Sequence, residues 1–369
     1  MKEDVKRAWH FSEYFLCEAT QAMTPEKIAE LLIQVSESFD AAMRRLNPLV
    51  LSDLRDGLLE HLPQLSAARQ FLHEAGPNIP LDESVRSGLL RACDFIIGAI
   101  RGFAREDDLQ AAYISALRAA RKHCRTLEAL FDLCDVFPGV NRYFLEEGLN
   151  PASSPDGSSP HAETGIIHVG SNRDLHARGG YSLYIPEAYT PNRSWPLIMA
   201  LHGGYSHGRD FLWTWLSSAR SRGFIVFAPT SLGMSWSITN VEADGQSLYR
   251  NLEEVCSRFH VDRRRIVLTG MSDGGTYALE LALSGGSIYQ AVAPVACALP
   301  PVDLKQARGK SIFWIHGEQD WIFPLTYAME AGKKLKSAGA AITFKVVRDL
   351  SHAYPREENS AILNWFEAG

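Results

Sequence analysis

The chain has 369 residues, of which 46% are hydrophobic and 22% charged, and its formal net charge at pH 7 is −6. This length predicts two domains, and the composition is typical of a globular protein with a sizeable core. A negative net charge without long runs of Lys or Arg argues against nucleic acid as a partner.

The cellular compartment is predicted from the N-terminal residues and from the cysteines. Residues 1–15 (MKEDVKRAWHFSEYF) lack an apolar h-region, and no segment approaches the roughly 18 apolar residues of a membrane span. We therefore expect no secretory signal and no membrane span. The cysteines form no CxxC pair and no histidine cluster at zinc spacing, which predicts free thiols, no metal and a cytoplasmic protein. They are Cys17, Cys93, Cys124, Cys134, Cys256 and Cys297.

Residues 1–148 are predicted to form an all-α domain. Thr24, Pro25 and Glu26 supply an N-cap, a first-turn proline and an acid that matches the helix dipole. Apolar stripes follow in 24–46, 89–103 and 127–134. These stripes suit any helical bundle, so three roles stay open for the domain: a cap over a pocket, a surface for homo-oligomerisation, or a separate binding module.

Residues 149–164 (LNPASSPDGSSPHAET) are rich in Pro, Ser and Gly and predict a linker. Residues 165–369 then alternate short apolar runs with amphipathic segments, which predicts a mainly parallel sheet flanked by helices. Seven strand candidates are YSLYIP, WPLIMALHGG, GFIVFAPT, RIVLTGMS, AVAPVA, SIFWIHGE and ITFKVV. In such sheets ligands bind beyond the carboxyl ends of the strands.

The segment Gly270-Met271-Ser272-Asp273-Gly274 lies between one of these runs and a helical stretch. A serine hydroxyl is a weak nucleophile, so it needs exposure on a sharp turn, a nearby base and donors for the developing oxyanion. A Gly-x-Ser-x-Gly turn between strand and helix supplies that exposure in hydrolases. The other interpretation of this pentapeptide is a structural turn.

A second turn, His202-Gly203-Gly204-Tyr205, ends another predicted strand upstream of the serine. The N–H groups of Gly204 and Asp273 are the expected oxyanion hole. His202 is expected to shape the turn without taking part in catalysis.

Asp320 and His352 follow later strand candidates, so the chain order is nucleophile, acid, base. The acid would hold the histidine in the correct tautomer and stabilise the imidazolium. Glu318 and Asp349 are the alternative acids. The competing bases are His207, His260 and His316.

Residues 165–369 resemble the α/β-hydrolase superfamily, and within it the phospholipase/carboxylesterase and polyhydroxybutyrate-depolymerase-like esterases. The resemblance rests on LHGG, GMSDGG, HGEQDWIFP and SHAYPREENSAILNWF in that order. It implies an eight-stranded α/β-hydrolase fold, an acyl-enzyme mechanism without a cofactor, and Ser272, Asp320 and His352 as the triad. Asp273 is a departure, because many relatives have Gln there.

Aromatic side chains at the strand ends predict a pocket for a small-molecule ester, with Tyr205, Trp236 and Trp321 as substrate-binding residues. Trp213 and Trp215 lie in a helical stretch and have either a pocket or a packing role. The predicted function is a serine carboxylesterase acting on small to medium soluble substrates. The alternatives are a peptidase or amidase with the same triad, and a non-catalytic hydrolase-fold binding protein.

Overall fold

The computed structural model describes residues 23–74, 81–103, 108–153, 163–170, 177–238 and 240–369. Cys17, the start of the chain and the middle of the predicted linker lie outside these ranges. The described chain divides into two compact units. One, the helical unit, holds the residues up to Met43 together with Pro48–Phe144. The other, the sheet unit, holds Arg44–Asn47 and Leu145–Gly369.

The helical unit consists of helices, as its apolar stripes predict. Thr24 Oγ1 accepts a hydrogen bond from the N–H of Lys27, so the predicted N-cap is present. The edge of the Phe39 ring meets Phe103 with centroids 5.8 Å apart, and both rings are buried. The elements are α2 (Pro25–Arg44), η1 (Pro48–Val50), α3 (Leu51–Leu59), α4 (Leu62–Glu74), α5 (Glu83–Gly102), α6 (Leu109–Phe131) and α7 (Pro138–Tyr143).

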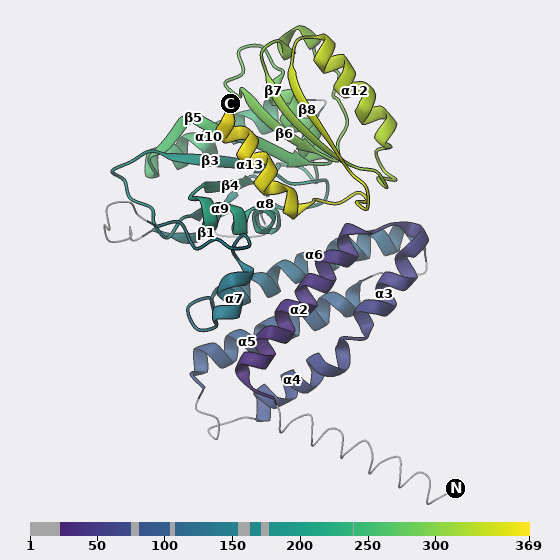
Figure 1. The fold of residues 1–369 in the computed structure, drawn as a ribbon, viewed down its shortest axis with the longest axis vertical. Coiled ribbons are helices and arrows are strands. Elements are labelled where there is room, and N and C mark those ends of the chain that lie inside the picture. Colours follow the sequence, from purple (N-terminus) through teal and green to yellow (C-terminus); the bar gives the residue numbers. More distant parts are fainter. Residues whose placement is uncertain (1–22, 75–80, 104–107, 154–162, 171–176, 239) are drawn as a thin grey trace, which may run out of the picture. The chain divides into compact units, whose positions relative to one another are not determined.

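The sheet unit is built on one eight-stranded sheet with the order β1-β2-β4-β3-β5-β6-β7-β8 (Figure 1). β1 and β2 run antiparallel to their neighbours and all other pairs are parallel. The strands are β1 (Gly165–Val169), β2 (Tyr181–Ile185), β3 (Trp195–Leu201), β4 (Ile225–Pro229), β5 (Val261–Met271), β6 (Ala291–Val295), β7 (Ser311–Gly317) and β8 (Ala341–Val347). The predicted fold class is confirmed, with β1 as an additional edge strand.

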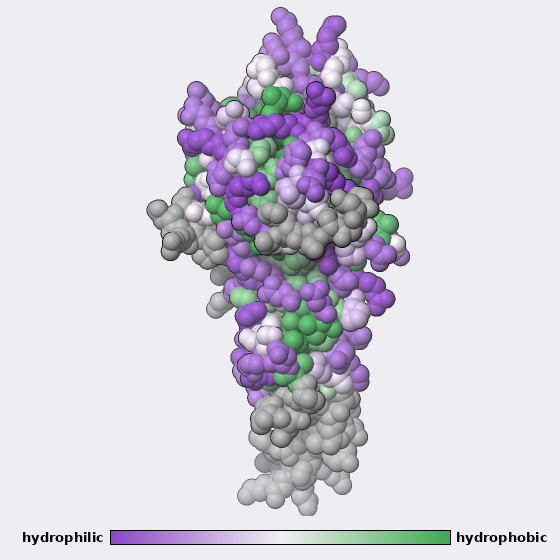
Figure 2. Space-filling view, turned by 90° about the vertical axis from the view of Figure 1, so that its left-hand side faces the viewer, coloured by the Kyte–Doolittle hydropathy of each residue, from purple (hydrophilic) through white to green (hydrophobic). Residues whose placement is uncertain are grey.

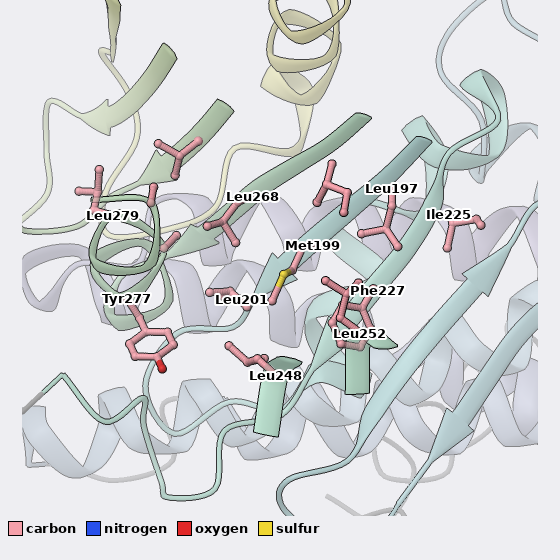
Figure 3. Packing of buried hydrophobic residues seen from close by; sticks show 14 of the residues in the cluster. Leu197, Met199, Leu201, Ile225, Phe227, Leu248, Leu252, Leu268, Tyr277 and Leu279 are labelled. Atoms are coloured by element: carbon pink, nitrogen blue, oxygen red, sulfur yellow. The ribbon is translucent and has the colours of Figure 1, made fainter. Parts of the chain in front are cut away.

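Helices cover both faces of the sheet (Figure 1). Leu248 and Leu252 of α10 pack with Met199 and Phe227 of the strands in one buried cluster (Figure 3). Burial of each such side chain contributes about 1.5–3 kcal/mol. The helical elements are α8 (Gly208–Phe211), η4 (Leu212–Thr214), α9 (Leu216–Arg222), α10 (Val241–Arg258), α11 (Asp273–Ala282), η5 (Leu304–Ala307), α12 (Leu325–Ser337), η6 (Arg356–Glu358) and α13 (Asn359–Ala368).

The surface is largely hydrophilic on the face that Figure 2 presents, as the charged composition leads one to expect. No helix within the described ranges is both long and apolar enough to cross a bilayer. The five cysteines of the described ranges are free thiols.

Glu280 of α11 is an acid in the apolar core. Its side chain is 9% exposed, and Oε2 has no hydrogen-bond partner among the described residues. Burial raises the pKa of Glu280 from 4.5 to about 7. Between about pH 4.5 and 7, Glu280 keeps its proton in the folded protein but has lost it in the unfolded chain. The burial of Glu280 therefore does not destabilise the protein at low pH, and its destabilising effect grows as the pH rises to about 7.

We therefore expect Glu280→Gln to stabilise the protein at about pH 8 by roughly 1 kcal/mol, allowing for solvent screening at the exposed edge, and by much less near pH 5. Thermal unfolding at the two pH values measures this, with the exposed Glu330→Gln on α12 as the matched control. Equal effects of Glu280→Gln at both pH values would contradict a buried, titrating carboxyl.

Candidate active site

Ser272 stands on a sharp turn between β5 and α11. Its φ of 55° lies in the left-handed region, which few residues other than glycine adopt. Gly270 permits the turn, because a methyl group on it would meet the carbonyl oxygen of Gly274 at 2.4 Å. Strand and helix therefore approach closely, and the serine hydroxyl projects beyond the carboxyl end of the sheet.

His352 lies between Ser272 and Asp320. Its Nε2 is 3.0 Å from Ser272 Oγ, and its Nδ1 is 2.9 Å from Asp320 Oδ2. The carboxylate can only accept, so Nδ1 carries the proton and Nε2 is left to accept the serine proton. The Asp320 side chain is fully buried, and its Oδ1 accepts the N–H groups of Ile322 and Phe323. These bonds fix the carboxylate against the histidine.

The loop that carries Asp320 follows β7, the loop that carries His352 follows β8, and the two loops are in direct contact. A methyl group on Gly317 would meet the carbonyl oxygen of Leu350 at 2.3 Å, so only glycine fits there. The N–H of Gln319 also donates to that carbonyl oxygen. This close approach brings residues 32 positions apart within hydrogen-bond distance.

The alternative acids point elsewhere. Glu318 is exposed, and the Asp349 side chain is 70% exposed with Oδ1 2.8 Å from Nη2 of Arg44. Arg44 is the last residue of α2 but belongs to the sheet unit, and its hydrogen bond lowers the pKa of Asp349. Neither acid makes a recorded hydrogen bond to His352.

Each of the three alternative bases makes a hydrogen bond to a group outside the triad. His316 is fully buried, and burial lowers its pKa. It donates from Nε2 to the carbonyl oxygen of Phe323 and accepts from Trp314 at Nδ1, so it is neutral. His207 accepts the N–H of Arg209 at the start of α8, and Nδ1 of His260 contacts the carbonyl oxygen of Pro191.

The His202–Tyr205 turn passes over the nucleophile. A methyl group on Gly203 would lie 3.5 Å from Cβ of Ser272, and one on Gly204 would lie 2.6 Å from Oδ2 of Asp273. Across the described ranges, the N–H groups of Gly204 and Asp273 donate to no protein atom. They are thus available to a substrate oxygen, as an oxyanion hole requires.

The three predicted substrate-binding aromatic residues differ in exposure. Tyr205 is 63% exposed and Trp321 is 39% exposed, whereas Trp236 is only 4% exposed. The Trp236 indole stacks on Tyr277 and donates from Nε1 to the carbonyl oxygen of His202 at 2.7 Å. Trp236 therefore supports the His202–Tyr205 turn from the interior, and its side chain offers almost no surface to a substrate.

Trp213 and Trp215 are buried, so the packing interpretation holds for both. Trp321 donates from Nε1 to the carbonyl oxygen of Leu46, a residue of the sheet unit. Phe323 lies beside the base, with its ring centroid 5.5 Å from that of His352. The exposed aromatic surface near the triad therefore comes from Tyr205 and from the segment after Asp320.

Two residues near the site were not predicted from the sequence. Ser235 donates a short hydrogen bond from Oγ to Oδ2 of Asp273. Asp244, 1% exposed, accepts the N–H groups of Leu232 and Ser237 and so fixes the loop that carries Ser235. Ser235 could have been suspected from the sequence because its loop directly follows β4 and so lies at the same end of the sheet as the triad.

Comparisons with known proteins find similarity to esterases. The model of the phospholipase/carboxylesterase family matches residues 241–368. The bifunctional acetylxylan esterase/xylanase XynS20E of Neocallimastix patriciarum is 29% identical over 207 residues, which is 53% of this chain and 28% of that protein. Feruloyl esterase C of Emericella nidulans is 29% identical over 182 residues, 47% of this chain and 64% of that protein. This chain thus spans less than two thirds of either relative.

A solved structure described as a thermostable esterase matches 55% of this chain and 62% of its own, at 17% identity and a TM-score of 0.44. The order of the eight strands, the turn at Ser272 and the family match together confirm the resemblance predicted from the motifs. The sheet unit of this chain has the α/β-hydrolase fold, and residues 241–368 are similar to the phospholipase/carboxylesterase family.

Proposed function

We propose that this protein is a serine carboxylesterase that hydrolyses small to medium carboxylic esters. The observation that carries the proposal is the continuous hydrogen-bonded series from Ser272 Oγ through His352 to Asp320. This series lies beside two backbone N–H groups with no protein acceptor within the described residues. A nucleophile, an oriented base and oxyanion donors are the parts that acyl transfer needs.

In the first half of the proposed reaction, Ser272 Oγ attacks the ester carbonyl carbon while His352 Nε2 takes its proton. The carbonyl oxygen becomes an oxyanion held by the N–H groups of Gly204 and Asp273. His352 then gives the proton to the leaving alcohol, and the acyl group stays on the serine. Asp320 stays ionised and balances the imidazolium charge.

In the second half, His352 takes a proton from a water molecule, which attacks the acyl carbon of the acyl-enzyme. A second tetrahedral oxyanion forms in the same hole. Its collapse breaks the bond to Ser272 Oγ, releases the carboxylic acid and returns the proton from His352 to the serine. One ester and one water thus give one acid and one alcohol.

The relatives suggest where to look for the substrate. One is named for acetylxylan and the other for feruloyl esters, so the proposed substrates are esters of short or aromatic acids with a carbohydrate alcohol. The exposed ring of Tyr205 suits a sugar or aryl group. A cytoplasmic location and a role of the helical unit in oligomerisation stay predictions from the sequence.

The test is a panel of p-nitrophenyl acetate, butyrate and octanoate, methyl ferulate, an acetylated xylo-oligosaccharide and p-nitroanilides of the same acids. We expect turnover of the esters, with the anilides at least about a hundredfold slower in kcat/KM. Comparable anilide turnover would favour the amidase alternative. Failure to cleave any ester or anilide would leave the non-catalytic binding protein.

A further inference from the structure

Asp273 occupies an unusual position for a carboxylate, directly after the nucleophile. It is the first residue of α11, and its Oδ2 would lie 2.6 Å from a methyl group on Gly204. The carboxylate is therefore in contact with the backbone of one proposed oxyanion donor, while its own N–H is the other. An acyl group whose carbonyl oxygen occupied the proposed oxyanion hole would therefore lie near this charge.

The position of the carboxylate is fixed from two sides. Ser235 Oγ donates to Oδ2, and the loop of Ser235 is held by the two hydrogen bonds to the buried Asp244. The first turn of α11 adds the positive end of a helix dipole, which favours an acid at this position. These contacts keep the carboxylate next to Gly204.

The Asp273 carboxylate forms no ion pair with a cationic side chain of the described residues. In the described part of the chain, no Lys, Arg or His nitrogen lies within the 4.0 Å of an ion pair with Asp273. Its recorded hydrogen-bond partner, Ser235, is neutral. A negative field therefore extends from Asp273 toward the proposed oxyanion hole, and it acts on any charge on an acyl group bound there.

We propose that Asp273 determines specificity by charge, so that the enzyme selects neutral or hydroxylated acyl groups and disfavours those that carry a carboxylate. The inference rests on the proposed esterase function. At a separation of roughly 7 Å and an effective dielectric constant of about 40, the repulsion between two unit charges corresponds to about a sevenfold change in kcat/KM. Monoesters of dicarboxylic acids are the disfavoured class.

The test compares two p-nitrophenyl esters of nearly equal size, one of adipic acid with its second carboxyl free and one with that carboxyl methylated. Asp273→Asn removes the charge but keeps an oxygen that accepts from Ser235. We expect it to raise the ratio of kcat/KM for the anionic over the neutral ester three- to tenfold. Glu330→Gln removes an exposed charge elsewhere on the sheet unit and should leave the ratio unchanged.

Ser235→Ala distinguishes the charge of Asp273 from the hydrogen bond that positions it. The substitution removes the hydrogen bond and leaves the carboxylate in place. It should change kcat/KM for both esters by the same factor. The wild-type protein gives a further readout, since added salt should raise the relative turnover of the anionic ester. A ratio insensitive to both Asp273→Asn and salt, with the neutral ester still cleaved, would overturn the inference alone. Failure of the wild type to cleave the neutral ester would instead overturn the esterase function.

Discussion

Replacing Ser272 by alanine is expected to lower kcat for ester hydrolysis by about 10⁵- to 10⁶-fold. The substitution removes the proposed nucleophile, because Ser272 Oγ lies 3.0 Å from His352 Nε2. The small residual rate would come from water attacking an ester bound in the oxyanion hole. Initial rates with p-nitrophenyl butyrate measure the effect.

Folding of the Ser272→Ala variant should be retained, because the serine side chain is partly exposed and, within the described residues, it hydrogen-bonds to His352 and to no other side chain. Circular dichroism and thermal unfolding check this. Ser284→Ala, an exposed serine just after α11, is the matched control and should keep wild-type kcat. Residual activity above about a tenth in the Ser272 variant would assign the nucleophile to another residue.

Asp320→Asn is expected to lower kcat about ten-thousandfold, whereas Asp349→Asn should change it by less than about twofold. Asparagine at 320 keeps an oxygen for the N–H groups of Ile322 and Phe323. Its amide group would then face His352 Nδ1 as a donor. The histidine would be held in the tautomer with the proton on Nε2, which cannot accept the proton of Ser272.

The Asp349 variant is the matched control for this pair. Asp349 is exposed and its carboxylate pairs with Arg44, so its loss should cost at most about 1 kcal/mol of stability. Rates of both variants should be measured with melting temperatures alongside. Equal losses of kcat in two folded variants would contradict the assignment of Asp320 as the acid.

Much of the sheet unit could be predicted from the sequence because its signals are local. Continuous apolar runs mark the buried parallel strands, and the residues with chemistry follow those runs directly. β1 was missed because Gly165–Val169 is a five-residue, half-buried edge strand next to a Pro- and Ser-rich segment. Its pairing with β2 is a tertiary contact that no local pattern announces.

The geometry around the triad depended on contacts between distant segments. The sequence predicts Ser272, Asp320 and His352 in that order and favours Asp320 over Asp349. The contacts that separate the two acids, at Gly317 and Arg44, join distant segments and are not visible in the sequence. Trp236 looked like a pocket residue because it follows a strand. Its indole instead turns inward onto Tyr277, and Ser235 beside it meets Asp273. Loop conformation of this kind is set by tertiary packing.

Ser272 is proposed as a nucleophile that His352 activates. Incubation of the full chain with a fluorophosphonate, followed by peptide mass spectrometry, tests this proposal most directly. We expect a single adduct on the peptide that contains Ser272, with loss of fluoride, and at least about a thousandfold slower labelling in His352→Ala. A folded protein that takes no label, or that is labelled on a different serine, would contradict it.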